Sequence, residues 1–138
     1  LIQGDGLPEH FIGLDPDRWL ESRLFQADTD RSCFAPDAVE AYRRAFRDPA
    51  AIHAGCEDYR AAATIDLEHH AADGGRTVDT PVLVLWGGDG FNARTFDVLA
   101  EWRRDFPRAE GRALPCGHFL AEERPEETLA ALTGFFGR

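Results

Sequence analysis

The sequence predicts an α/β fold with a helix-rich first half, followed by a strand, a helix, a second strand and a final helix. Two patterns carry this prediction. Apolar side chains recur mostly at helical spacing before Gly74-Gly75, whereas Pro81–Trp86 is a continuous, mostly aliphatic run closed by glycines. Such a run is typical of a strand buried on both faces. Because two strands are too few for a covered parallel sheet, we expect neighbouring strands from upstream of Leu1.

Four helices are expected in the first half. Residues 15–25 form a short helix that begins at an Asp-Pro cap, and residues 35–48 form an amphipathic helix with acids in its first turn and arginines near its end. A third helix runs from Ala50 to about Thr64. The fourth begins near Ile65 and stops at Gly74-Gly75.

The second half is expected to alternate strand and helix. After the Pro81–Trp86 strand, residues 93–106 are predicted to form one helix and residues 111–114 a short second strand. A loop over residues 115–123 follows. Pro125 opens the last helix, which carries an apolar stripe.

The amino-acid composition limits the classes of ligand or partner that the protein is expected to bind. The chain has 138 residues, with 25 acidic against 15 basic side chains, and its net charge of −10 disfavours nucleic acid and anionic membranes and favours a small or neutral ligand. No apolar run approaches the roughly 20 residues that span a bilayer, and no basic apolar leader opens the chain, so we expect a soluble cytoplasmic protein. Three cysteines without a CxxC pair are expected to be reduced thiols. Because Leu1 cannot be a ribosomal start, we expect a processed or incomplete chain.

The candidate catalytic residue is His118. The run GHFLAEE, residues 117–123, places it in a loop after a predicted strand, where a parallel sheet presents side chains at its carboxyl edge. An imidazole titrates near neutral pH, so it can take a proton from water and return it when an acid orients its other ring nitrogen. A solvent-facing loop histidine is the alternative that position alone leaves open.

Five segments together resemble the C-terminal half of haloacetate dehalogenases, the fluoroacetate dehalogenase group of the α/β-hydrolases. They are PEHFIGLDP, CEDYRAAATIDLEH, PVLVLWG, EWRR and ALPCGHFLAEERPEETLAAL, and they are spread over nearly the whole chain. The resemblance implies an eight-stranded core interrupted by a helical cap. Residues 1–74 would be the cap and the helix returning to the core, and residues 75–138 the C-terminal portion of the core, with its last two parallel strands and helices.

The resemblance also implies a reaction. An Asp carboxylate displaces the halide of a haloacetate such as fluoroacetate, and a His-activated water hydrolyses the resulting ester to glycolate, with no metal or organic cofactor. His118 matches the base. Tyr59, in CEDYR, matches a tyrosine whose hydroxyl donates to the departing halide, and an aromatic ring packed on a helix is its alternative role. A small haloacid is the implied partner and a homodimer the implied assembly.

The other parts of that reaction would lie before Leu1, namely the nucleophilic Asp, the carboxylate-binding arginines, the acid of the triad and a His-Trp halide pair. We therefore expect the isolated 138 residues to be inactive. Two alternatives stay open. Another capped α/β-hydrolase, such as an epoxide hydrolase, would share the Asp nucleophile and the histidine, and a non-catalytic remnant would serve as a binding or dimerisation module.

Other chemistry-bearing residues favour structural roles. Asp89 follows the buried strand and is interpreted as a turn residue rather than the triad acid, and Cys116 as a packed thiol rather than a nucleophile. The metal-ligand residue types in the helices are not expected to form a zinc site; they are His53, Cys56, His69 and His70. The acids around Pro125 are expected to favour a helix dipole; they are Glu122, Glu123, Glu126 and Glu127. The glycines after the strand, Gly87, Gly88 and Gly90, lack the Lys of a phosphate-binding loop.

Overall fold

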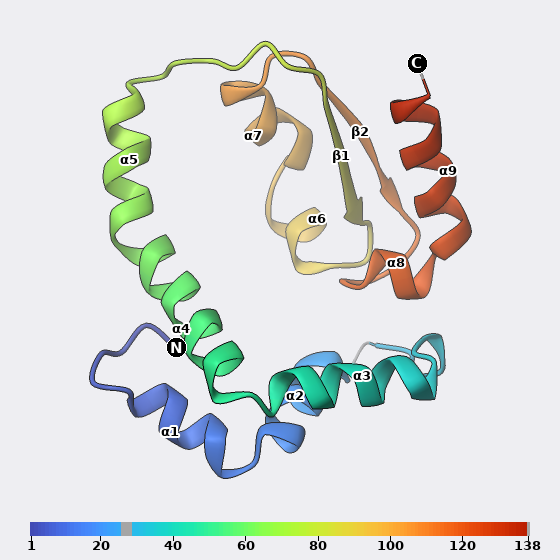
Figure 1. Ribbon diagram of the computed structural model, residues 1–138. Coiled ribbons are helices and arrows are strands. Elements are labelled where there is room, and N and C mark those ends of the chain that lie inside the picture. Colours follow the sequence, from blue (N-terminus) through green and yellow to red (C-terminus); the bar gives the residue numbers. More distant parts are fainter. Residues whose placement is uncertain (26–28, 138) are drawn as a thin grey trace. The chain divides into compact units, whose positions relative to one another are not determined.

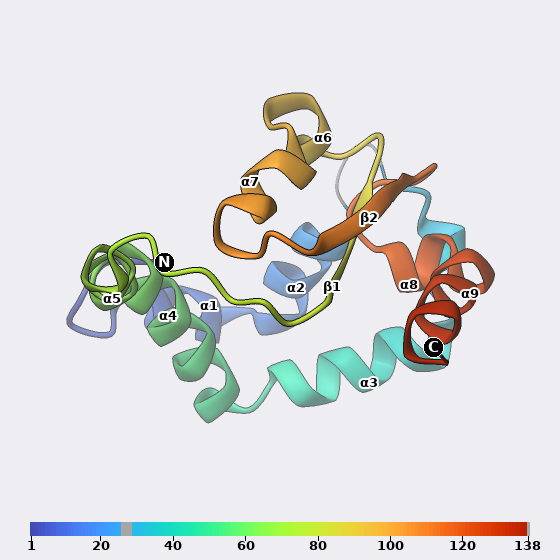
Figure 2. The ribbon, with the colours of Figure 1, turned by 90° about the horizontal axis from the view of Figure 1, so that it is seen from above.

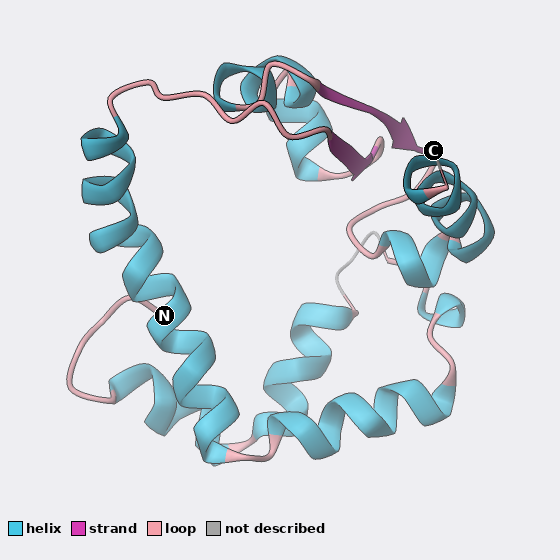
Figure 3. Ribbon diagram, turned by 45° about the horizontal axis from the view of Figure 1, so that its top comes forward, coloured by secondary structure: helices cyan, strands magenta, loops and turns pink. Residues whose placement is uncertain are grey.

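The computed structural model describes residues 1–25 and 29–137 and divides them into two compact units. The helical unit comprises residues 1–25 and 34–74, and the strand unit comprises residues 29–33 and 75–137. Figure 1 labels the helices and strands, and Figure 3 shows that the two strands follow the long helical stretch of the chain. The order is the one that the sequence predicts, mostly helical with two parallel strands in the second half.

The described part of the helical unit holds five α-helices. They are α1 (Leu7–Leu14), α2 (Pro16–Leu24), α3 (Pro36–Phe46), α4 (Pro49–Ala63) and α5 (Ile65–Asp73). The last four match the predicted helices, and α5 stops at Gly74, whose φ of 61° is left-handed and therefore suits glycine. The first helix is an addition to the prediction. The sequence pattern does not predict this helix from a capping residue, because the N-cap residue is Gly6, which has no side chain to form a capping hydrogen bond.

A small apolar cluster joins α1 to α4. Ile12 of α1 packs with Ile52 and Cys56 of α4, and all three side chains are buried. Trp19 and Phe46 lie partly buried against this cluster. The apolar core of the helical unit is therefore small, and polar side chains make much of the contact between its helices.

Ion pairs connect α2 to α3 on that polar surface. The Arg43 guanidinium pairs with Glu21, and the Arg47 guanidinium makes two hydrogen bonds to the Asp17 carboxylate. The Arg47 guanidinium beside Asp17 lowers the pKa of that carboxyl below its usual value. Charged side chains thus carry part of the packing between these helices.

The strand unit contains a parallel pair, β1 (Val82–Gly87) and β2 (Ala109–Leu114), in register from Val82 opposite Ala109 to Gly87 opposite Leu114. Helices α6 (Phe91–Thr95) and α7 (Val98–Asp105) lie on one side of the pair, and α9 (Pro125–Phe136) lies on the other (Figure 2). A short helix, α8 (Leu120–Glu123), precedes α9, and η1 (Arg31–Cys33) belongs to the same unit. Every residue of β1 is buried or half-buried, as expected for a strand covered on both faces.

Three predicted boundaries in this unit are wrong. The single helix over residues 93–106 is two helices, because Phe96 is extended and Asp97 starts a new helix by accepting a hydrogen bond from the Ala100 amide at 3.1 Å. The second strand begins at Ala109, earlier than expected. The predicted loop over residues 115–123 ends in α8.

Among the described residues, no helix combines the length and the apolar character that crossing a membrane requires.

Candidate functional site

Two loops adjoin at the carboxyl edge of the strand pair. Because β1 and β2 are parallel, the turn after β1 and the loop over residues 115–119 leave the sheet on the same side. The Gly88 amide donates to the Leu114 carbonyl at 2.8 Å, and the Asp89 amide donates to the Cys116 carbonyl at 3.0 Å. The turn after β1 therefore anchors the beginning of the loop that carries the candidate base.

Gly87 allows these two loops to approach each other closely. A Cβ atom at this position would stand 1.6 Å from the Gly117 carbonyl oxygen and 2.7 Å from the Cys116 carbonyl oxygen. No side chain fits between these backbone groups. The glycine serves packing of backbone against backbone, which agrees with the interpretation that this run is not a phosphate-binding loop.

Glu123 holds the same loop from its other end. Its Oε2 accepts a hydrogen bond from the Gly117 amide at 2.8 Å, and its Oε1 accepts one from the Phe119 amide at 3.0 Å. Hydrogen bonds to an ionised carboxylate are stronger than those between neutral groups. Glu123 lies in the first turn of α8, and Glu126 and Glu127 lie in the first turn of α9, as expected for acids that favour a helix dipole. The two hydrogen bonds to loop amides are an additional role of Glu123.

His118 lies between the two amides that Glu123 binds. Its side chain is exposed, and its ring meets the Phe119 ring edge to face at a centroid distance of 5.0 Å. In the described part of the chain, neither the His118 imidazole nor the Asp89 carboxylate has a hydrogen-bond partner, so Asp89 does not orient this ring. The structure thus presents an accessible imidazole on a backbone that is fixed around it.

Tyr59 belongs to the helical unit and not to the unit that contains His118. It projects from α4, and its side chain is 55% exposed. Within the described residues its hydroxyl has no partner, so the hydroxyl is available to donate a hydrogen bond.

Arg60, the next residue along α4, connects this helix to the start of the chain. Its guanidinium binds the Glu9 carboxylate with two hydrogen bonds of 2.7 and 2.9 Å, and it also binds Glu57. Two further hydrogen bonds, of 3.0 and 2.6 Å, reach the Gln3 carbonyl. The Arg60 hydrogen bonds lower the pKa of the Glu9 carboxyl to about 2. This network anchors the turn of α4 that carries Tyr59.

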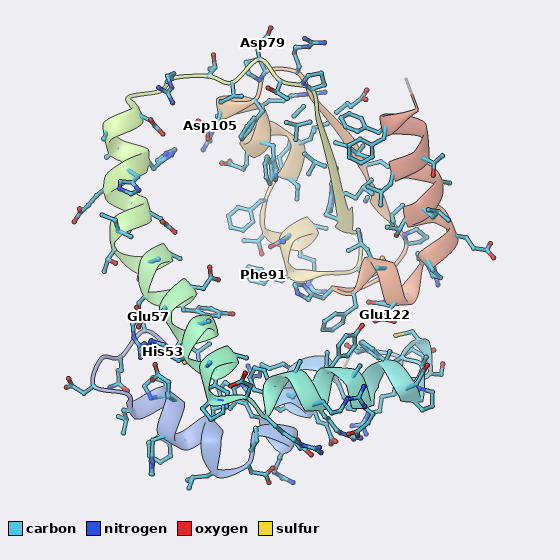
Figure 4. All side chains as sticks on the ribbon, in the orientation of Figure 1. His53, Glu57, Asp79, Phe91, Asp105 and Glu122 are labelled. Carbon is cyan, nitrogen blue, oxygen red and sulfur yellow. The ribbon has the colours of Figure 1, made fainter. Side chains whose placement is uncertain are left out.

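His53 is a third member of the acidic cluster formed with Glu9 and Glu57, and Figure 4 shows His53 and Glu57 on α4. The potential ligand atoms of the three residues lie within 4.8 Å of one another, and the residues border a cavity of about 450 Å³. Because the Arg60 guanidinium already pairs with both carboxylates, we interpret the cluster as an ion-pair network rather than a metal centre.

The other metal-ligand candidates are not in this cluster. Cys56 is buried in the apolar core, and His69 and His70 are exposed on α5. All three cysteines are free. Burial raises the pKa of the Cys33, Cys56 and Cys116 thiols, and the interpretation of Cys116 as a packed thiol is confirmed by its burial.

Two of the contacts that hold Tyr59 and His118 in place are not predicted from the sequence. Glu9 and Arg60 are 51 residues apart, and no local pattern connects them. Glu123 had a weak local signal, because an acid shortly after a helix start often reaches back to the amide of the N-cap residue. Here the N-cap residue is Phe119, and the carboxylate reaches beyond it to Gly117.

Comparison with known proteins agrees with this architecture, although no protein-family model matches the chain. The fluoroacetate dehalogenase of Burkholderia sp is 40% identical over 129 residues, which are 93% of this chain and 42% of that protein. The soluble epoxide hydrolase of Corynebacterium sp. (strain C12) is 29% identical over 128 residues, which are 91% of this chain and 43% of that protein.

Among solved structures, a protein from Nostoc sp PCC 7120 described as an α/β-hydrolase is 52% identical, with a TM-score of 0.93 over 98% of this chain and 46% of its own. This chain therefore spans less than half the length of the relatives it matches. Its two parallel strands and their helices match the C-terminal half of α/β-hydrolase structures. The chain is a partial α/β-hydrolase, related to fluoroacetate dehalogenase and to epoxide hydrolases.

Proposed function

We propose that this chain forms part of a hydrolytic dehalogenase that converts a haloacetate, such as fluoroacetate, to glycolate and halide through an Asp-ester intermediate. The observation that carries the proposal is the placement of His118 as an exposed imidazole on a loop held at the carboxyl edge of a parallel strand pair. The 40% identity to a fluoroacetate dehalogenase supports the choice of substrate class.

In the proposed reaction His118 acts on the second chemical step. It takes a proton from water, the resulting hydroxide adds to the ester carbonyl, and glycolate leaves as the carboxylate nucleophile is regenerated. Tyr59 acts on the first step, in which its hydroxyl donates a hydrogen bond to the departing halide. The resemblance assigns the nucleophilic Asp to a segment before Leu1.

The first experiment reads the coding sequence upstream of Leu1. We expect an in-frame His-Trp pair directly before Leu1 and a Gly-x-Asp-x-Gly elbow further upstream. A stop codon or an unrelated reading frame at that position would contradict the proposal. The protein encoded by the complete reading frame is then assayed for fluoride release from fluoroacetate.

In that protein, replacing His118 with Asn should leave ester formation intact and block ester hydrolysis. Loss of a general base slows a step by roughly 10² to 10⁴-fold, so the ester should accumulate. Intact-protein mass spectrometry after mixing with fluoroacetate measures the trapped adduct, which the unmodified enzyme should not retain. Continued halide release without any adduct would assign the base to another residue.

Replacing Tyr59 with Phe should slow carbon–halogen cleavage by about tenfold or more, because one donor to a developing anion is lost. Rapid-quench measurement of the first halide released tests this step. Tyr42, the other tyrosine of the chain, lies on α3 and provides the matched control. Tyr42→Phe should keep the unmodified rate, and an unchanged rate in Tyr59→Phe would reduce Tyr59 to a packing role.

The second candidate function is epoxide hydrolysis, favoured by the 29% identity to a soluble epoxide hydrolase over almost the same part of the chain. An Asp ester hydrolysed by a histidine-activated water serves both reactions, so the chemistry of His118 does not separate them. Diol formation from an epoxide without halide release from haloacetates would decide for this candidate.

A further inference from the structure

We infer that Glu123 is a positioning residue for His118, because its carboxylate fixes the two peptide groups between which the imidazole is carried. Both oxygens are used, Oε2 for the Gly117 amide at 2.8 Å and Oε1 for the Phe119 amide at 3.0 Å. The His118 amide between them has no partner in the described part of the chain. The inference rests on the proposed role of His118 as the base.

The hydrogen-bonding pattern exceeds what a helix cap requires. Phe119 is the N-cap residue of α8, so the bond from its amide serves the helix start. Gly117 stands two residues earlier, outside the helix, and the bond from its amide adds nothing to α8. This second bond acts on the loop alone and fixes the backbone directly before His118.

The residues around the loop leave space for the Glu123 carboxylate. A Cβ atom at Gly117 would stand 3.1 Å from one Glu123 oxygen and 3.4 Å from the other, so a residue without a side chain leaves room for the carboxylate. On the other side of the loop, the Asp89 amide binds the Cys116 carbonyl and Gly87 permits close packing of the Gly117 carbonyl. The backbone is therefore held from both sides while the imidazole remains exposed.

This arrangement predicts a kinetic effect that differs between the two chemical steps. A displaced imidazole activates water poorly, because general base catalysis needs hydrogen-bond contact between the base and the water. Formation of the ester uses the upstream nucleophile and does not need His118. A loose loop should therefore slow ester hydrolysis while ester formation keeps its rate.

The first test measures amide hydrogen exchange by NMR in the protein encoded by the complete reading frame. The protection factor of an amide is its intrinsic exchange rate divided by its measured rate. We expect protection factors at the Gly117 and Phe119 amides that are at least about ten times the protection factor of the His118 amide. Glu123→Gln, which replaces one of the two acceptor oxygens with an NH₂ group, should remove the protection of at least one of these two amides. Glu126→Gln makes the same change of charge at an exposed first-turn position of α9 and should leave their protection unchanged.

If Glu123→Gln fails to fold, the exchange pattern of the unmodified chain decides. Protected amides on both sides of an unprotected His118 amide support the inference, and equal exchange at the three amides overturns it. This readout does not depend on any catalytic activity, so it is informative even if the proposed function fails.

The second test measures the two chemical steps in the protein encoded by the complete reading frame. Glu123→Gln should slow decay of the covalent adduct by about tenfold or more and leave its rate of formation unchanged, and Glu126→Gln should change neither rate. Equal slowing of both steps, or an unchanged decay rate, overturns the positioning role. Absence of halide release in the unmodified protein instead overturns the proposed function, and the exchange measurement still decides whether Glu123 fixes the loop.

Discussion

In the helical unit, the turn of α4 that carries Tyr59 is held by ion pairs between side chains, whereas in the strand unit the loop that carries His118 is held by contacts to its backbone, from other backbone groups and from the Glu123 carboxylate. Arg60 binds two carboxylates and a carbonyl on the helical side. On the strand side, backbone amides bind carbonyls and the Glu123 carboxylate, and a glycine lets two loops touch. Two parts of one chain thus use different forces to keep a candidate functional residue in place.

The difference determines what each region responds to. Ion pairs between partly exposed side chains weaken when salt screens them or when acid neutralises the carboxylates. Close packing of backbone against backbone responds to added volume instead, because nothing at the contact can move aside without shifting the chain. Added volume and salt should therefore separate the two regions, and the lowered pKa of Glu9 should give the helical unit an acid response of its own.

The largest effect is expected from Gly87→Ala. The new Cβ would overlap the Gly117 carbonyl oxygen, so the free energy of unfolding of the strand unit should fall by about 3 kcal/mol, at the upper end of overpacking effects. Gly134→Ala is the control, because a Cβ at this exposed helical glycine meets nothing within 4 Å and should stabilise α9 by about 0.5–1 kcal/mol. Urea unfolding followed by circular dichroism measures both, and equal stability of the two variants would refute the packing role of Gly87.

A smaller effect is expected from acid, and it should concern the helical unit. The Arg60 hydrogen bonds lower the pKa of Glu9 from 4.5 to about 2, so between these values the unfolded chain binds more protons at this carboxyl than the folded chain does. The stability contributed by Glu9 is therefore fully present above pH 4.5 and is lost as the pH falls towards 2.

Glu9→Gln should reduce stability at neutral pH and flatten the loss of stability across that acid window. Urea unfolding at several pH values between 2 and 7 measures the slope. Glu68→Gln, at an exposed position of α5, is the control and should keep the unmodified slope. An unaltered slope in Glu9→Gln would mean that the Arg60 network does not couple this carboxyl to folding.

The smallest effect is expected from salt and is detected at two buried thiols. Cys56 lies in the core of the helical unit, and Cys116 lies in the loop of the strand unit. Raising NaCl from about 0.01 M to about 1 M shortens the Debye length from about 30 Å to about 3 Å. Alkylation by iodoacetamide, followed by peptide mass spectrometry, should accelerate a few-fold at Cys56 and little at Cys116. Equal acceleration at both thiols would remove the distinction between the two regions.

The sequence by itself determined the order of helices and strands and the placement of His118. Aliphatic residues in a continuous run predicted β1, helical spacing and proline at helix starts predicted most helices, and Gly74 marked the end of α5. These signals are local, since each depends on the periodicity or backbone preference of a few neighbouring residues. The break at Phe96 was missed because Asp97 caps a new helix inside a run that otherwise has helical spacing.

Tertiary structure alone decided what holds the candidate residues. The Arg60–Glu9 pair joins residues 51 positions apart, and the Gly87–Gly117 contact joins the end of β1 to the loop after β2. No periodicity encodes such contacts, because they exist only after the chain has brought distant segments together. Local backbone preferences placed His118 in a loop after a strand, but contacts between distant parts of the chain determine how firmly that loop is held.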